Sequence, residues 1–307
     1  MSKAIVFDEY GGPDVLRVVD VQRPEPGPGQ VRVRVRAAGV QPFDCLFRSG
    51  AARQWVPARF PQRIGNELAG VVDAIGDGDA RGFAIGDDVI GWAMLGAMAE
   101  HVIVPASDLV AKPAAMPWPE AGALSASGQT ASTAIEKLRV ARGETILIHA
   151  AAGGVGSFAV QLARAAGARV IGTASPANHD YLRELGAEPV AYGAGLVERV
   201  RALAPVGVDV ALVAVATEEA LRSSLELVRD RARVGTVAFL PLTEQLGVAR
   251  ITTERSAARL GALVERYARG EMRVAIQQVF AFEDAAAAHR VMEGGHVRGK
   301  IAVAGPP

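Results

Sequence analysis

The chain has 307 residues, half of them hydrophobic, and its 33 basic residues are balanced by 33 acidic ones. This length fits about two domains, and the apolar fraction is enough to fill more than one core. The neutral net charge excludes the broad positive field by which proteins bind nucleic acids or anionic membranes. A small molecule is therefore the expected partner.

The cysteine content and the N-terminus predict the compartment. The single cysteine, Cys45, excludes an intrachain disulfide, and the opening residues MSKAIVFDEYGG lack the apolar core of a secretory signal. The longest apolar runs, such as VALVAVA at 210–216, are too short to cross a bilayer. We therefore expect a cytoplasmic protein.

The first 115 residues predict strands. VRVRVRAAGV at 31–40 alternates valine and arginine with a period of two, which is typical of a sheet with one face in water. The turn signal PEPGPGQ precedes it, and glycine, aspartate and proline separate the later apolar runs ELAGVVDAIG, DDVIGWAM and AEHVIVPA. An all-β region is expected here.

The pattern changes between residues 116 and 269. GALSASGQTASTAIEKL predicts a helix, and after residue 145 short apolar strands alternate with amphipathic helices. The predicted strands are TILIHA, ARVIGTA, EPVAY, VDVALVAV and ARVGTVAF, and the helices between them include HDYLRELGA, GLVERVRALA and TEEALRSSLELVRD. Such alternation predicts a parallel sheet with helices on both faces. A further helix is expected near RSAARLGALVERYARG.

Residues 270–307 return to the spacing of the first region, with a strand, a helix at EDAAAAHRVMEG and a final strand at GKIAVAG. We therefore predict one domain from residues 1–115 and 270–307, and a second from residues 116–269. The expected fold class is α/β, with a doubly wound parallel sheet and a smaller β-rich domain.

The stretch HAAAGGVGSFAVQLARAAGARVIGTAS at 149–175 carries a nucleotide-binding pattern. Ala151, Gly153 and Gly156 stand at the offsets of the Rossmann motif G-x-G-x-x-G, in which the glycines allow close approach of a pyrophosphate and close helix packing. A helix beginning near Val155 would offer its amide groups and positive dipole end to phosphate oxygens. The alternative is a glycine turn that serves packing alone. The expected cofactor contacts are Ala152, Gly153, Gly154, Val155 and Gly156.

Ser175 stands where an NAD site has an acid. That acid holds the ribose hydroxyls, and its charge repels a 2′-phosphate. Here the second strand continues as TASPANHD, with no carboxylate before Asp180. Ser175 and Asn178 can donate hydrogen bonds to a phosphate, so the sequence favours NADPH over NADH. Asn178 could instead cap the helix that follows it.

On these residues the chain resembles the zinc-independent quinone oxidoreductase branch of the medium-chain dehydrogenase/reductase superfamily. The resemblance covers nearly the whole chain, through EYGGPDVL, PGPGQVRVRVRAAGV, FDCLFRSG, IGNELAGVV, FAIGDDVIG, AEHVIVPA, GQTA, AAAGGVG, YLRELGA and GKIAV. It implies a GroES-like substrate domain built from both ends of the chain, a Rossmann domain, and an active site in the cleft between them. It also implies a homodimer joined through edge strands near ARVGTVAF.

The zinc ligands of the alcohol dehydrogenase branch are replaced. Gln41 and Asn66 stand where that branch has a cysteine and a histidine, and the run of cysteines for a structural metal is missing. A zinc site needs thiolate or imidazole ligands, so we expect no metal. Without a Lewis acid, alcohol oxidation loses its main alkoxide stabilisation, which favours a quinone or an α,β-unsaturated carbonyl as hydride acceptor. Cys45 is interpreted as a small loop residue.

The resemblance also implies roles for single residues. Gln41 matches a polar position near the nicotinamide and substrate, although it could be a solvated loop amide, and Thr130 matches a threonine beside the nicotinamide, although it could only cap a helix. Both would position groups, and no general acid is evident. Tyr192 matches an aromatic on the adenosine side, Phe239 lies where the backbone meets the carboxamide, and Lys300 recurs near the cofactor unless it is a surface ion-pairing lysine.

The sequence therefore predicts an NADPH-dependent reductase that transfers hydride to a quinone or to an α,β-unsaturated carbonyl. Leu46 stands where many relatives have a tyrosine, which leaves open an enoyl-thioester or polyketide-tailoring reductase. A third possibility is a non-catalytic NADPH-binding protein, because motifs predict binding more securely than turnover.

Overall fold

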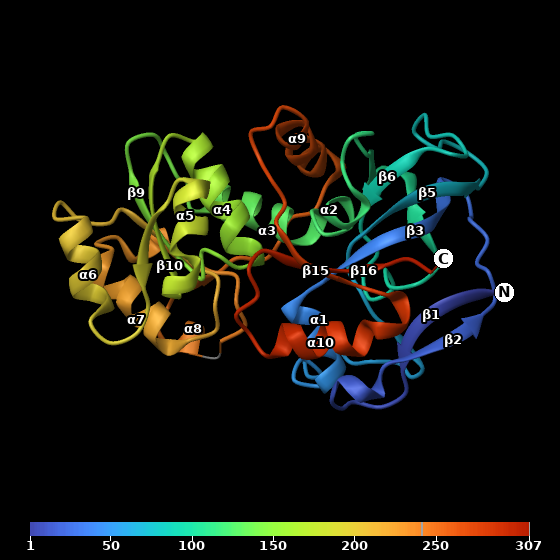
Figure 1. Cartoon of the computed structure of the whole chain (residues 1–307), viewed down its shortest axis with the longest axis horizontal. Helices are drawn as coiled ribbons and strands as arrows, with labels where there is room; N and C mark the ends of the chain where they lie inside the picture. The colour runs from blue at the N-terminus through green and yellow to red at the C-terminus, as the bar shows by residue number, and fades with distance from the viewer. Residues whose placement is uncertain (241, 307) are drawn as a thin grey trace. The chain divides into compact units, whose positions relative to one another are not determined.

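The computed structural model describes residues 1–240 and 242–306 and contains two compact units. Unit 1 comprises residues 1–126 together with the C-terminal residues from Ser256 onward, and unit 2 comprises Ser127–Arg255. Figure 1 shows the chain coloured from end to end, so that the blue and red segments of unit 1 can be followed. Both ends of the sequence therefore build one unit, and a continuous middle segment builds the other.

The described residues of unit 1 form two sheets. The smaller one is antiparallel, with β1 (Ser2–Phe7) between β2 (Arg17–Val21) and β4 (Gln62–Arg63). The larger one has the order β15 (Ile276–Phe280), β16 (Lys300–Ala304), β3 (Gln30–Val40), β5 (Leu68–Ile75), β6 (Asp88–Gly91) and β8 (Leu109–Ala111), and β7 (His101–Pro105) also pairs with β3. Only the pair β15–β16 in this sheet is parallel among the described strands. The last strand of the chain thus pairs antiparallel with β3.

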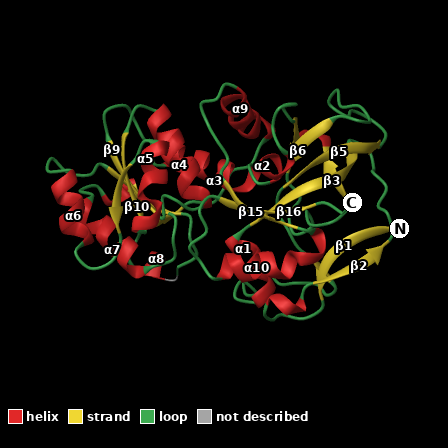
Figure 2. Ribbon diagram, in the orientation of Figure 1, coloured by secondary structure: helices red, strands yellow, loops and turns green. Residues whose placement is uncertain are grey.

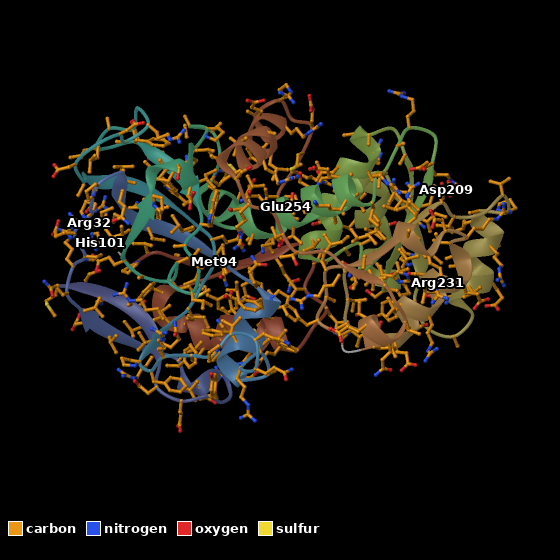
Figure 3. All side chains as sticks on the ribbon, turned by 180° about the vertical axis from the view of Figure 1, so that it is seen from behind. Arg32, Met94, His101, Asp209, Arg231 and Glu254 are labelled. Atoms are coloured by element: carbon orange, nitrogen blue, oxygen red, sulfur yellow. The ribbon has the colours of Figure 1, made fainter. Side chains whose placement is uncertain are left out.

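The alternation predicted for β3 holds for its apolar face. Its first three valines are buried in the core of unit 1, and Arg34 and Arg36 are exposed on the opposite face. Arg32, however, is only 7% exposed, because its Nε atom lies 2.8 Å from Oδ1 of Asp73. His101 reaches the same carboxylate, with Nε2 3.3 Å from Oδ2, and Figure 3 shows Arg32 and His101 close together. This end of the predicted wet face is therefore a buried polar cluster.

An α-helix and two short 3-10 helices, Pro13–Val15 and Ala106–Asp108, interrupt the region that we predicted to be all strands. α1 (Pro42–Ser49) begins with a proline, whose missing N–H is not needed in a first turn, and ends at Gly50 with a φ of 83°. It contacts α10 (Ala285–Glu293), as Figure 1 also shows. The helix was missed because two of its buried residues, Asp44 and Arg48, are charged and hide the apolar period.

Unit 1 extends to residue 126 and resumes at residue 256, whereas we predicted limits of 115 and 270. Two helices account for the difference. α2 (Trp118–Gly122) packs on β3 and β5, and α9 (Ala257–Ala268) contacts β8. Both helices therefore belong to unit 1. Neither contact could be read from sequence, because local composition does not show which sheet a helix covers.

Unit 2 is built on a parallel sheet. The strand order is β11 (Glu188–Ala191), β10 (Arg169–Ala174), β9 (Thr145–His149), β12 (Val210–Val213), β13 (Val234–Thr236) and β14 (Ala249–Arg250). Every pairing in it is parallel. Counted along the chain, this is the order 3-2-1-4-5-6 of the Rossmann fold. The predicted fold class is confirmed.

Helices cover both faces of this sheet, as Figure 2 shows for the strands β9 and β10. They are α3 (Ser125–Lys137), α4 (Gly154–Ala165), α5 (His179–Leu185), α6 (Leu196–Leu203), α7 (Glu218–Leu227) and α8 (Leu242–Gln245), of which α3 begins in unit 1. α4 contacts β9 and β10, and α7 contacts β12. Within residues 1–240 and 242–306, no helix has the length and apolarity that a membrane span requires.

Candidate functional site

The loop between β9 and α4 has the geometry of a nucleotide cradle. Gly153 is the N-cap of α4. The helix begins at Gly154, one position before the predicted start near Val155. A Cβ atom on Gly156 would lie 2.2 Å from the carbonyl oxygen of Ala150 and 2.7 Å from Cα of Ala151. Only glycine fits at position 156, because strand and helix meet there without space for a side chain.

The cradle is tied to the neighbouring strand. The amide of Ala151 donates to the carbonyl of Thr173 at 2.9 Å, and the amide of Ala150 donates to the Thr173 hydroxyl at 3.1 Å. The first turn of α4 follows directly, and the amides of a first turn have no intrahelical acceptor. The loop thus lies at the carboxyl ends of β9 and β10, where a helix N-terminus can hold a pyrophosphate.

Ser175 and Asn178 lie together just after β10. Nδ2 of Asn178 donates to Oγ of Ser175 at 3.1 Å, and the side chain of Asn178 makes no capping bond to α5. The structure therefore does not contain the helix cap that was the alternative for Asn178. The nearest carboxylate in sequence, Asp180, is 93% exposed and pairs with Arg183 at 2.6 Å. A hydroxyl and an amide, and no acid, occupy the turn after β10.

Tyr192 directly follows β11, as Ser175 directly follows the neighbouring strand β10. Ala174 is in register with Ala191 at the ends of β10 and β11, so Ser175 and Tyr192 each follow the last paired residue. Half of Tyr192 is exposed. Three residues predicted on the adenosine side are thus neighbours just beyond the carboxyl ends of β10 and β11: Ser175, Asn178 and Tyr192.

Thr130 and Phe239 lie elsewhere in unit 2. Thr130 is within α3, not at its start, and its hydroxyl is 2.7 Å from that of Thr253, so it is not a helix cap. Glu254, which follows Thr253 and is labelled in Figure 3, forms an ion pair with Lys137 of α3, with Oε1 2.7 Å from Nζ. The ring of Phe239 lies under the guanidinium of Arg250, 3.9 Å from its centroid, as a cation–π contact.

In unit 1, Gln41 and Lys300 meet at one carboxylate. Nζ of Lys300 is 3.0 Å from Oε1 of Glu67, Nε2 of Gln41 donates to the same oxygen, and the amide of Ala126 donates to Oε2 at 2.6 Å. Gln41 is 8% exposed, Lys300 is 2% exposed and Glu67 is fully buried. Gln41 is therefore not a solvated loop amide, and Lys300 is an ion-pairing lysine in the interior, not on the surface.

A second buried carboxylate adjoins this ion pair. Asp44 accepts from the backbone amide of Gln41 at 2.8 Å and from Nδ2 of Asn66 at 2.6 Å. The pKa of Asp44 is raised to about 7, mainly by burial and in part by the charge of Glu67, although the two hydrogen bonds and the charge of Lys300 act in the opposite direction. Asp44 and Glu67 were not identified from sequence, because only the fold brings β5, α1 and β16 together.

Cys45 has an imidazole neighbour that sequence did not suggest. Its Sγ lies 3.5 Å from Nδ1 of His289, 244 positions away on α10. Burial raises the pKa of the Cys45 thiol to about 12 and lowers the pKa of His289 to about 3. Both groups are therefore neutral at pH 7, which is the opposite of the thiolate–imidazolium pair of a cysteine nucleophile.

The residues at the zinc-ligand positions do not fit zinc. Gln41 and Asn66 carry amides, and each donates a hydrogen bond to a buried carboxylate. Zinc prefers thiolate and imidazole ligands. In the part of the chain that the structure describes, no three or more histidine, cysteine or acidic side chains are grouped to hold a metal ion.

Comparisons with known proteins agree with both units. Residues 27–114 match the family described as alcohol dehydrogenase GroES-like domain, and residues 154–281 match the family described as zinc-binding dehydrogenase. A quinone oxidoreductase of Pseudomonas aeruginosa is 34% identical over 313 residues, covering 94% of this chain and 95% of the relative.

Two solved structures share the fold over almost the whole chain. Quinone oxidoreductase of Escherichia coli complexed with NADPH has a TM-score of 0.86 at 27% identity, covering 98% of this chain and 99% of that one. The enoyl reductase CurK has a TM-score of 0.88 at 27% identity, covering 99% of each chain.

Proposed function

The chain belongs to the medium-chain dehydrogenase/reductase superfamily, in its quinone oxidoreductase-like branch, and from this premise we propose that it is an NADPH-dependent oxidoreductase that reduces a quinone or an α,β-unsaturated carbonyl without zinc. The observation that carries the proposal is the turn after β10. Ser175 and Asn178 occupy this turn in place of the acidic residue of an NAD site. The charge of such an acid would repel a 2′-phosphate.

Bound NADPH would supply a hydride from its nicotinamide ring. The residues of unit 2 would hold it: the first turn of α4 would face the pyrophosphate, and Ser175 would donate to the 2′-phosphate. Escherichia coli quinone oxidoreductase, which shares the fold, was solved with NADPH. Gln41 and Thr130 are proposed to position the nicotinamide and the substrate.

Two features support zinc independence. The amides of Gln41 and Asn66 are tied to Glu67 and Asp44, so the zinc-ligand positions are occupied by a closed hydrogen-bonded network. An electron-poor quinone or enone accepts hydride without a Lewis acid, whereas alcohol oxidation depends on alkoxide stabilisation. Elemental analysis of the purified protein is expected to find less than stoichiometric zinc.

The cofactor test compares Ser175→Asp with the wild type. We expect wild-type protein to bind NADPH more tightly than NADH in isothermal titration, and Ser175→Asp to lose at least about tenfold in NADPH affinity, since the new charge opposes the 2′-phosphate. Ser107→Asp, at an exposed serine of unit 1, adds the same charge as a control. Equal affinity of the wild type for the two coenzymes would contradict the proposal.

A substrate screen separates the remaining functions. Loss of NADPH absorbance with quinones and simple enones is the expected result. Turnover of acyl thioesters alone would assign an enoyl-thioester reductase, a candidate supported by the likeness to CurK. Tight NADPH binding with no turnover of any acceptor would instead identify a non-catalytic NADPH-binding protein.

A further inference from the structure

The segment between β11 and α6 is held by a single guanidinium group. Nη2 of Arg199 donates to the carbonyls of Ala191 at 2.9 Å, Gly193 at 3.0 Å and Tyr192 at 3.4 Å. Nη1 donates to the carbonyl of Ala194 at 2.7 Å. Four successive carbonyls thus turn toward one side chain, which fixes the backbone from which Tyr192 projects.

This clamp lies at the carboxyl ends of β10 and β11, where Ser175 also lies. The last register pair of β10 and β11 is Ala174 with Ala191, and the next residues are Ser175 and Tyr192. A Rossmann sheet binds its dinucleotide at the carboxyl ends of its strands. The half-exposed Tyr192 side chain therefore starts beside the proposed position of the 2′-phosphate.

Among the residues that the structure describes, the guanidinium of Arg199 is bound by backbone oxygens and not by a carboxylate. In residues 1–240 and 242–306, its hydrogen-bond partners are backbone carbonyls, and it forms no ion pair. Arg201 on the same helix differs, because its Nη2 is 2.9 Å from Oε1 of Glu226. Arg183, near Ser175 in sequence, is likewise paired with Asp180. Arg199 thus keeps its positive charge at the edge where Ser175 and Asn178 provide only neutral donors.

We propose that Arg199 is a positioning residue for NADPH, which orders residues 191–194 so that the Tyr192 hydroxyl meets the 2′-phosphate beside Ser175. The inference rests on the NADPH dependence proposed above. A preordered loop lowers the entropy cost of binding, and a guanidinium without an ion-pair partner favours a phosphate over a hydroxyl. Lysine cannot replace the clamp, because it lacks the planar fork that reaches several carbonyls at once.

A double-mutant cycle tests this role. Arg199→Lys, Tyr192→Phe and the double variant are titrated with NADPH and with NADH by calorimetry. Each single variant is expected to lose about tenfold in NADPH affinity, as for one hydrogen bond to a charged group, and to change little toward NADH. In the Arg199→Lys background, Tyr192→Phe should have almost no further effect, because an unclamped Tyr192 no longer meets the phosphate.

The control is Arg201→Lys, which alters an exposed ion pair on the same helix and should leave both affinities unchanged. Unchanged NADPH binding by Arg199→Lys, equal losses for both coenzymes, or additive effects of the two substitutions would each overturn the inference. A wild type without NADPH preference would overturn the proposed cofactor as well. If the wild type prefers NADPH and Arg199→Lys keeps that preference, the inference about Arg199 fails and the proposed function stands.

Discussion

Gly156 in the nucleotide loop has no room for a side chain, since an added Cβ would meet Ala150 at 2.2 Å and Ala151 at 2.7 Å. Backbone atoms cannot move aside as a flexible side chain can. Gly156→Ala should therefore lower the free energy of unfolding by about 1–3 kcal/mol and weaken NADPH binding. Urea denaturation and coenzyme titration measure the two effects.

Gly261→Ala is the matched control for this substitution. Gly261 lies within α9, and the nearest atom to an added Cβ is a methyl group of Val110 at 3.9 Å. Alanine is the better helix former, so the variant should gain about 0.5–1 kcal/mol and bind NADPH as the wild type does. Two variants of equal stability would show that Gly156 is not tightly packed.

His149 predicts a pH dependence of stability. It is 1% exposed in β9, with Nε2 3.0 Å from Oγ of Ser224, and burial lowers its pKa to about 4. The folded state keeps the ring neutral while the unfolded state takes up a proton below pH about 6.5. The contribution of His149 is therefore complete above pH about 6.5 and is lost as the pH falls toward 4.

His149→Gln isolates this contribution, because glutamine does not titrate and its amide can still reach Ser224. Between pH about 6.5 and about 4, the unfolding free energy of the wild type should fall more steeply than that of the variant, by up to about 1.4 kcal/mol per pH unit. Urea unfolding at several pH values gives both slopes. Parallel slopes would mean that His149 takes up its proton equally in the folded and unfolded states, which would contradict the lowered pKa.

The thiol of Cys45 should be inert in the native protein. Its pKa is raised to about 12 by burial, so the reactive thiolate is scarce at neutral pH. Ellman's reagent is expected to react with Cys45 only after the protein is unfolded with guanidinium. A stoichiometric fast reaction under native conditions would contradict the neutral pair that Cys45 forms with His289.

Sequence can predict candidate site residues where they belong to local motifs. Gly156 and Ser175 could be predicted because their roles depend on neighbours a few positions away in one βαβ unit. Glu67, Asp44 and His289 could not, because each acquires its partner from a distant segment of the chain. Arg199 was also missed, since an arginine on an amphipathic helix usually faces water.

At the scale of elements, the ion pair of Lys300 and Glu67 links the first residue of β16 to the residue directly before β5. Removing the charge of Lys300 leaves the buried carboxylate of Glu67 without an opposite charge, so Lys300→Met should cost about 3–5 kcal/mol of unfolding free energy. The double variant Lys300→Met with Glu67→Gln should recover much of that loss. Urea denaturation of the single and double variants measures both.

An exposed ion pair provides the control. The side chains of Arg201 and Glu226 are 57% and 54% exposed, so Arg201→Met should cost less than about 1 kcal/mol. A similar small loss for Lys300→Met would show that water reaches the buried carboxylate.

Most elements of unit 2 could be predicted because strands and helices there follow regular apolar periods. The predicted helices at HDYLRELGA, GLVERVRALA and TEEALRSSLELVRD correspond to α5, α6 and α7. The two-residue strand β14 was not predicted, since so short a segment has no period. It pairs with β13, so the edge strand on that side of the sheet is β14, not the ARVGTVAF strand through which the resemblance implies a dimer contact.

At the scale of the whole molecule, we expect a homodimer, now through β14. An edge strand with open hydrogen-bonding groups is suited to pairing with a second copy. Sedimentation analysis should give twice the chain mass of 32.0 kDa at micromolar concentration. A mass of one chain across the concentration range would exclude the dimer.

The pairing of both chain ends in one unit was predicted, whereas the limits of that unit were not. Apolar spacing showed that residues 270–307 resemble the first region, and β16 does pair with β3. The helices α2 and α9 join unit 1 through tertiary packing alone, which leaves no mark in local composition.

The position of β16 in its sheet has a consequence for synthesis on the ribosome. β3, made early, pairs with β16, which is made after all of unit 2. Domains form in the order in which their segments emerge, so unit 2, being continuous, can fold while unit 1 is still incomplete. Until translation passes residue 300, the end of β3 that pairs with β16, residues 37–40, is open on that side to chaperones and to wrong partners.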